Sequence, residues 1–189
     1  ELVTWVMGEV LREKKKISKD VSLQLVRMCD AGMSNIKNEL DKLVAYCDAQ
    51  ITATDVSRLV SKAMGVRVFE LTDNIMAKNA DGALKILRDL KMINEPAFKI
   101  LYLLASTFDK MLQTSLMLSE GAGYQEISSK IGIAPFIVQK YANSARGFGE
   151  NYLTDRVIEI ADIDLSIKNG EISDWDALEG YVINACEKV

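Results

Sequence analysis

The segment from residue 124 to residue 146 has the side-chain types and spacing of a nucleic-acid contact. A short amphipathic pattern ends at Gly132 and Pro135 opens a second one, which together predict a helix-turn-helix-like pair. In a DNA-reading arrangement the second helix faces the major groove and a following arginine lies near a phosphate. The residues so placed are Phe136, Gln139, Lys140, Asn143 and Arg146. An ordinary helical corner explains the same pattern, so both interpretations stay open here.

A second basic cluster, Lys14, Lys15, Lys16 and Lys19, falls between two predicted helices. Lysines in a loop contact phosphate as point charges and read no base sequence. Glu9 and Glu13 nearby offset this charge, so a solvated turn is the simpler interpretation.

Residue types needed for catalysis are scarce. The 189 residues include no histidine, which removes the usual proton shuttle, histidine-activated nucleophiles and every histidine-bearing metal site. No glycine-rich phosphate loop followed by Lys and Ser or Thr occurs, and Asp162 and Asp164 diverge on a helix. We therefore expect no catalytic residue, no metal ligand and no cofactor site in this chain. A helical enzyme remains an alternative only if polar residues converge in a pocket.

The three cysteines, Cys29, Cys47 and Cys186, are odd in number and far apart. No Cys-x-x-Cys pair is present to bind zinc or exchange thiols. We expect buried free thiols in a reducing compartment.

The elements that position these residues are predicted to be helices throughout, since apolar residues recur every three or four positions and only two prolines occur. Thr52 with Asp55 three residues later predicts a capped helix start, Ser34 a second cap, and Gly32 and Gly65 helix ends. The predicted helices span 2–14, 19–30, 34–48, 52–64, 67–78, 80–91, 96–119, 124–131, 135–146, 150–168 and 174–187. The expected fold class is all-α.

Charge divides the chain unevenly. The net charge is −4, which argues against nucleic-acid binding by the whole surface. Residues 1–60 carry nine basic and nine acidic groups, residues 61–150 carry 11 and nine, and residues 151–189 carry three and nine. A local contact is therefore most compatible with the middle of the chain. The chain starts at Glu1 without a basic or apolar leader, and we expect a piece of a longer protein without a signal peptide.

Six segments in order resemble the delta subunit of the bacterial DNA polymerase III clamp loader. They are 39–47 (Glu-Leu-x-Lys-Leu-x-x-Tyr), 51–60 (Ile-Thr-x-x-Asp-Val-x-x-Leu-Val), 68–75 (Phe-x-Leu-x-Asp-Ala-Ile), 83–90 with 94–96 (Ala-Leu-x-Leu-Leu-x-x-Leu and Glu-x-Pro), 131–140 (Leu-Gly-Val-x-Pro-Phe-x-Val-x-Lys) and 161–170 (Ala-Asp-x-x-x-Lys-x-Gly). Asn74 departs from the common alanine. The resemblance covers nearly the whole chain.

This resemblance implies two domains, a small helical lid of the AAA+ type at 1–62 and a larger helical-bundle collar at 63–189. The collar would join a pentameric loader with gamma/tau and delta-prime subunits, which bind ATP, and the loader would place the sliding clamp on primed DNA in the bacterial cytoplasm. Contact with the clamp would be made by an N-terminal domain missing here. The chain itself would be non-catalytic.

The resemblance also implies candidate contacts. Primer-template DNA would meet Gln139, Lys140, Tyr141 and Arg146, since they combine cations with an aromatic face that can stack on an unpaired base. Neighbouring subunits would meet apolar residues of the long helix 96–119, namely Leu101, Leu104, Phe108, Met111 and Leu112, although a place in its own core is the expected role of most. The alternative function is a sequence-specific helix-turn-helix regulator, which would bind one duplex site far better than random duplex.

Overall fold

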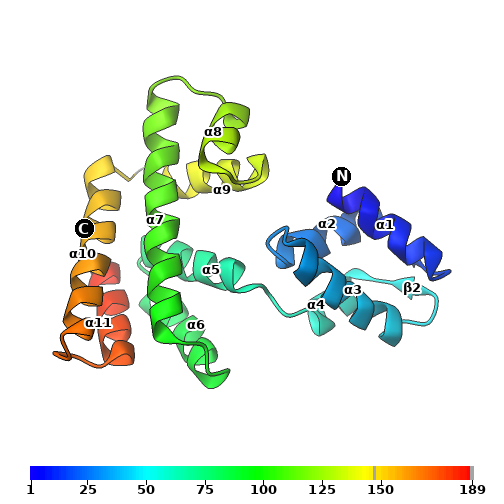
Figure 1. The fold of residues 1–189 in the computed structure, drawn as a ribbon, viewed down its shortest axis with the longest axis horizontal. Helices are drawn as coiled ribbons and strands as arrows, with labels where there is room; N and C mark the ends of the chain where they lie inside the picture. The colour runs from blue at the N-terminus through cyan, green and yellow to red at the C-terminus, as the bar shows by residue number, and fades with distance from the viewer. Residues whose placement is uncertain (147, 188–189) are drawn as a thin grey trace. The chain divides into compact units, whose positions relative to one another are not determined.

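The computed structural model describes residues 1–146 and 148–187 and divides the chain into two compact units, Glu1–Arg67 and Val68–Val189. Eleven helices lie within the described residues (Figure 1). The helices are α1 (Leu2–Arg12), α2 (Lys19–Met28), α3 (Met33–Tyr46), α4 (Ala53–Leu59), α5 (Met64–Met76), α6 (Ala80–Met92), α7 (Ala97–Ser119), α8 (Tyr124–Ile131), α9 (Pro135–Ala145), α10 (Glu150–Lys168) and α11 (Asp174–Glu187). The predicted all-α class is confirmed. The assignment of residues 1–62 to a lid domain and of residues 63–189 to a collar domain stays a prediction.

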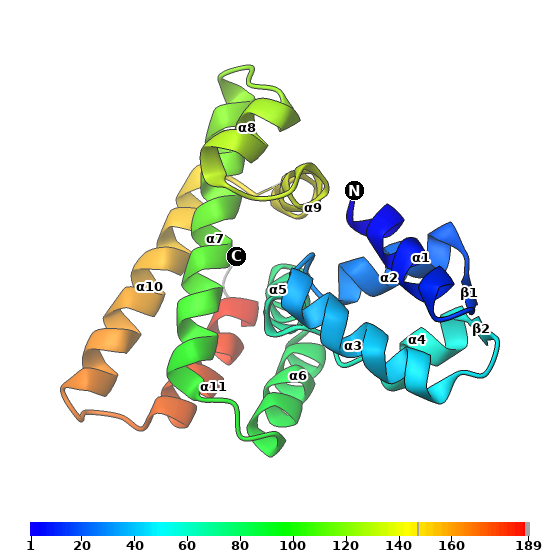
Figure 2. The same ribbon diagram turned by 45° about the vertical axis from the view of Figure 1, so that its right-hand side comes forward.

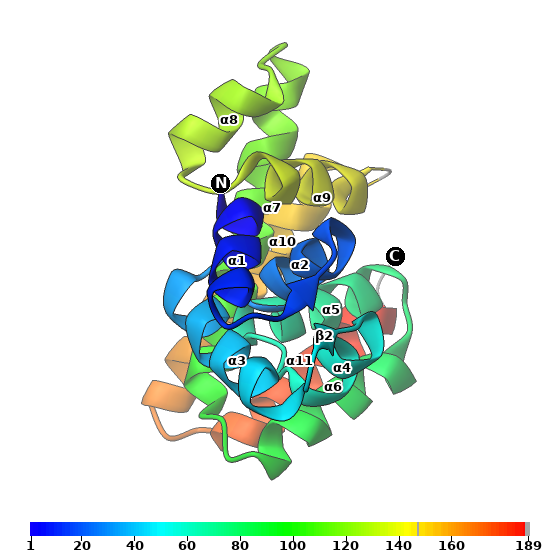
Figure 3. The ribbon, with the colours of Figure 1, turned by 90° about the vertical axis from the view of Figure 1, so that its right-hand side faces the viewer.

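The first unit packs α1 to α4 around one apolar core (Figure 3). The amphipathic stripe predicted from residue 36 onward faces inward on α3, where Ile36 and Leu43 have no exposed surface. Val6 and Val10 of α1 and Leu25 of α2 meet this stripe from the other helices, also fully buried. The unit therefore has a core of its own.

A two-residue parallel bridge, which the sequence did not predict, closes the first unit. Strand β1 (Lys16–Ile17) pairs with β2 (Gln50–Ile51). Lys15 next to it donates from its ammonium to the carbonyls of Val44 and Cys47 at the end of α3. Lys15 of the predicted solvated cluster is thus anchored, while Lys14, Lys16 and Lys19 are exposed. The bridge was not predicted because runs of two residues are too short to show strand alternation.

Three residues predicted to mark helix boundaries, Gly32, Ser34 and Gly65, do not do so as expected. The chain leaves α2 through Asp30 and Ala31, both at φ 53°, so they supply the left-handed turn expected of Gly32. Gly32 instead precedes α3 as its N-cap, and Ser34 does not cap it. Gly65 lies inside α5, because α4 already ends at Leu59.

The capping box at the start of α4 is confirmed. The Thr52 hydroxyl accepts a hydrogen bond from the Asp55 amide at 3.3 Å, and the Asp55 carboxylate accepts one from the Thr52 amide at 2.9 Å. These bonds satisfy amides that a helix start otherwise leaves without partners. The Thr52 hydroxyl, at 2.6 Å, and the Thr52 amide both donate to the Asp55 carboxylate, and these bonds hold the Asp55 pKa below its ordinary value.

The second unit is organised by α7, the 23-residue helix near its centre (Figures 1 and 2). Helix α10 runs in the opposite direction along α7, while α8 and α9 pack on its C-terminal half. Helix α11 contacts α6, α7 and α10. The buried residues of α7 fall at helical spacing on one face, including Ile100, Leu104, Phe108 and Met111.

We expect Thr52→Ala to lower the free energy of unfolding of the first unit by about 1 kcal/mol, since it removes the N-cap of α4. Urea titration followed by Trp5 fluorescence in a Trp175→Phe background reports this unit alone. Thr54→Ala, a change at an exposed position inside the same helix, is the matched control and should leave the midpoint nearly unchanged. Equal effects of the two changes would contradict the capping role.

Candidate functional site

The helix-turn-helix-like pair exists as predicted and is formed by α8 and α9. Gly132 ends α8 in the left-handed conformation at φ 75°, and Pro135 takes the first position of α9. The Ser128 hydroxyl donates to the Ile133 carbonyl at 2.6 Å across the turn. We call α8, the turn and α9 the α8–α9 corner.

The four residues predicted to contact DNA do not share one environment. Gln139 and Arg146 are exposed. Lys140 is exposed too, but its ammonium lies 3.3 Å from the centroid of the Phe69 ring on α5. The Tyr141 side chain is 8% exposed and its ring stacks on Phe69 at 5.6 Å between centroids. The expected stacking of Tyr141 on a base does not hold in this structure, because Phe69 and the core occupy its ring.

A hydrogen bond between side chains also fixes the α8–α9 corner to α5. The Ser144 hydroxyl donates to Asp73 Oδ1 at 2.7 Å. Burial raises the pKa of Asp73 above its ordinary 3.8, and the Ser144 bond and the Lys140 charge oppose that shift. The corner is therefore held by an aromatic stack and a partly desolvated carboxylate.

The five residues of α7 predicted to contact other subunits mostly face the interior. Leu101 is 3% exposed, and Leu104, Phe108 and Met111 have no exposed surface, while Leu112 is half-buried. The four buried side chains cannot meet a partner unless the second unit opens. Most of these five residues therefore belong to the core of the second unit, as expected.

The outer side of the same helix carries large apolar side chains that the sequence reasoning missed. Phe98 is 68% and Tyr102 71% exposed, and their spacing of four residues places them on one face of α7. Met92 and Ile93, just before α7, are 80% and 54% exposed. We call these four residues the exposed apolar face. Grouped exposed apolar side chains are typical of an interaction site.

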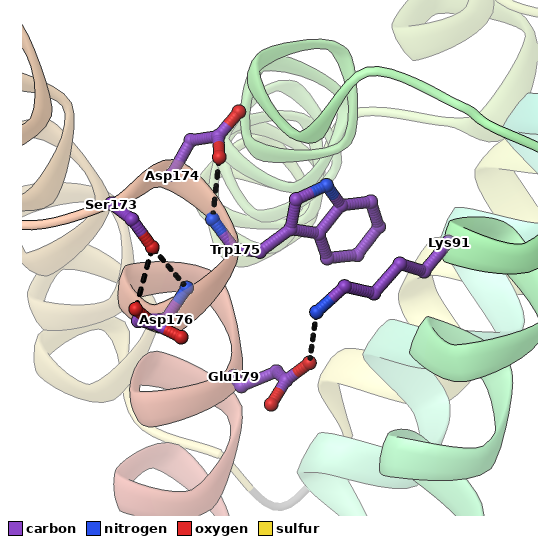
Figure 4. Close-up of polar contacts among 6 residues, drawn as sticks. All are labelled: Lys91, Ser173, Asp174, Trp175, Asp176 and Glu179. Carbon is purple, nitrogen blue, oxygen red and sulfur yellow. Dashed lines mark hydrogen bonds and ion pairs between the residues drawn. The ribbon is translucent and has the colours of Figure 1, made fainter.

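The end of α6, which carries Met92 of the exposed apolar face, is anchored by α11 (Figure 4). The Lys91 ammonium lies 3.2 Å from Glu179 Oε1 and 5.1 Å from the centroid of the Trp175 ring. Ser173 caps the start of α11 by accepting from the Asp176 amide at 3.3 Å. The end of α6, and with it Met92, is thus held in place.

Arg156, in the acidic terminal segment of the chain, is buried and therefore not accessible to a ligand. Arg156 on α10 is 3% exposed, donates to Glu159 Oε1 at 2.9 Å and lies 4.9 Å from the centroid of the Tyr152 ring. Tyr181 of α11 is buried near it, and this burial raises its pKa. The cluster joins α10 to α11 and is a structural feature.

The described residues bear on the metal ligands and free thiols considered from the sequence. Within residues 1–146 and 148–187 no set of three His, Cys, Asp or Glu side chains is placed to hold a metal ion. The predicted free thiols are confirmed at Cys29, Cys47 and Cys186, all buried. Burial raises the Cys29 pKa to about 11, so it is a poor nucleophile. No described helix is long and apolar enough to cross a bilayer.

Comparison with known proteins points to one family. A family model described as the DNA polymerase III delta subunit, C-terminal domain, matches residues 66–185. DNA polymerase III subunit delta of Bacillus subtilis (strain 168) is 29% identical over 178 residues, which is 93% of this chain and 51% of that protein. The probable delta subunit of Aquifex aeolicus (strain VF5) is 22% identical over 152 residues, 78% of this chain and 43% of its own.

A solved structure shows the same fold. The Bacillus subtilis DNA clamp loader delta protein covers 99% of this chain with a TM-score of 0.90 and 28% identity, and 56% of that protein is matched. The chain therefore spans about half the length of the relatives it matches.

The raised pKa of Asp73 leads to a pH-dependent prediction. The folded chain holds the Asp73 proton more tightly than the unfolded chain, so this residue contributes less stability as pH rises from about 3.8 to neutrality. We expect the unfolding free energy of Asp73→Asn, relative to the unmodified chain, to increase over that range, because the amide keeps an acceptor for Ser144 and does not ionise.

Urea titrations at several pH values, followed by Trp175 fluorescence in a Trp5→Phe background, measure this difference. Asp89→Asn, at an exposed position of α6, is the matched control and should give a smaller pH dependence. A relative stability of Asp73→Asn that falls with rising pH would overturn the assigned cause.

Proposed function

The chain belongs to the DNA polymerase III delta subunit family, of which it contains the C-terminal domain, and we propose that its second unit is the collar that joins the other clamp-loader subunits. In this proposal the partners are gamma/tau and delta-prime subunits, and the first unit is the AAA+ lid. The observation that carries the proposal is the exposure of Phe98 and Tyr102 on α7, a helix whose opposite side forms the core.

The exposed apolar face is better suited to subunit contact than the five residues selected from the sequence. Phe98 and Tyr102 present aromatic area without any unfolding of the unit, whereas Leu104 and Phe108 have none to present. Aromatic side chains supply much of the binding energy at protein interfaces. Lys91 and its contacts with α11 hold the preceding turn, which lowers the ordering cost on binding.

The proposed role is non-catalytic. The chain would act by assembly, while ATP binding belongs to partner subunits and clamp contact to a part of the relatives that this chain does not match. The high pKa of the Cys29 thiol and the lack of histidine are compatible with this role. We propose that it acts in the bacterial cytoplasm, at the replication machinery.

Any contact with primer-template DNA is assigned to the exposed residues of the α8–α9 corner. Gln139 and Arg146 are the accessible members, with Lys140 beside them. Such a contact would be weak, dependent on salt and independent of base sequence. Family membership sets aside the alternative of a sequence-specific helix-turn-helix regulator, although the helix pair itself is present.

We expect Tyr102→Ser to weaken association with the partner subunits about 30-fold, the loss of roughly 2 kcal/mol typical of an aromatic interface anchor. Light scattering coupled to size-exclusion chromatography, followed by calorimetric titration, measures assembly of the complete delta subunit with gamma/tau and delta-prime. Leu11→Ser is the matched control, since Leu11 has the same 71% exposure but lies on α1.

Circular dichroism of both variants checks that each is folded. Undiminished assembly of both Tyr102→Ser and Phe98→Ser would refute this interface, as would an equal loss in Leu11→Ser.

A further inference from the structure

A groove in the first unit is lined by residues of α1, its C-terminal end and α3. Figure 3 shows the backbones of these two helices. The groove has a volume of about 200 Å³. It is lined by Trp5, Glu9, Glu13, Lys37, Leu40, Asp41, Val44 and Ala45. This volume is below the range of sites for drug-sized ligands and suits a single side chain.

The floor of the groove is apolar and its rim is acidic. Leu40 is buried, and the Trp5 and Val44 side chains are half-buried, so each keeps some surface open. Glu9 lies on α1, four residues beyond Trp5, and Glu13 follows four residues later as the C-cap of the helix. Asp41 belongs to α3, across the groove. An indole face and carboxylates thus border one small space.

The carboxylates are only partly neutralised. Glu9 bonds to Arg12, and Asp41 Oδ1 lies 3.6 Å from the Lys37 ammonium in a pair that is well exposed on both sides. Glu13 has no ion pair with any residue that the structure describes. Three carboxylates and one cation, Lys37, line the groove, so its net charge is negative, which repels phosphate and favours a further cation.

We propose that this groove binds an arginine side chain presented on the surface of a partner protein. A guanidinium lies flat on an indole and donates two parallel hydrogen bonds to a carboxylate, whereas an ammonium is a hydrated point charge. Trp5 supplies the indole and Glu13 the open carboxylate. The inference uses only side chains that line the groove in the first unit and does not rest on the proposed function.

The test is a titration of the 15N-labelled chain with the probe acetyl-Gly-Arg-Gly-amide, observed at the Trp5 indole N–H signal. Trp5 and Trp175 are the only tryptophans, and Trp5→Phe assigns the two signals. We expect a saturable shift of the Trp5 signal alone. Peptides with lysine or with neutral citrulline in place of arginine should bind about fivefold to tenfold more weakly, as expected for loss of a hydrogen-bonded charged contact.

Glu13→Gln should weaken binding of the arginine peptide to a similar extent, while Asp48→Asn, an exposed carboxylate of the same unit outside the groove, should not. A citrulline peptide that binds equally well, or an unaffected Glu13→Gln variant, would overturn the charge pairing. Equal binding of the lysine peptide would overturn the assignment to arginine. A Trp5 shift that follows protein concentration alone would assign the groove to a second copy of the chain and also overturn the proposal.

Discussion

The burial of one face of α7 is the constraint on which the second unit depends. A helix of 23 residues is about 35 Å long, and Leu104, Phe108 and Met111 along it have no exposed surface. Once these side chains face α9, α10 and α11, the spacing of the helix forces Phe98 and Tyr102 to the opposite side. The same packing that stabilises the unit therefore creates the exposed apolar face that we assign to subunit contact.

The first unit is held by shorter-range means. The β1–β2 bridge, the Lys15 bonds to the end of α3 and the Thr52–Asp55 capping box join its helices around the core of Ile36 and Leu43. Each of these contacts satisfies backbone groups at a helix end or a strand edge. They leave the outer sides of α1 and α3 free to form the groove.

Features set by local sequence were predictable and features set by distant contacts were not. The cap at Thr52, the turn at Gly132 and the helix opened by Pro135 depend on neighbouring residues, and all three are confirmed. The burial of Tyr141 depends on Phe69 of another helix, which no local pattern shows. The apolar stripe of residues 96–119 identified the helix but not its exposed side, since both sides carry large apolar residues. The left-handed turn at Asp30 and Ala31 was not predicted either, because glycine is the residue expected in that conformation.

We expect the exposed apolar face to become covered in the clamp loader. Hydroxyl-radical footprinting of the complete delta subunit, alone and assembled with gamma/tau and delta-prime, measures the exposure of side chains directly. Met92, Phe98 and Tyr102 should be oxidised readily in the free subunit and strongly protected in the complex, while Leu11 and Phe108 should not change. Oxidation of Phe98 and Tyr102 at the same rate in both states would contradict the account.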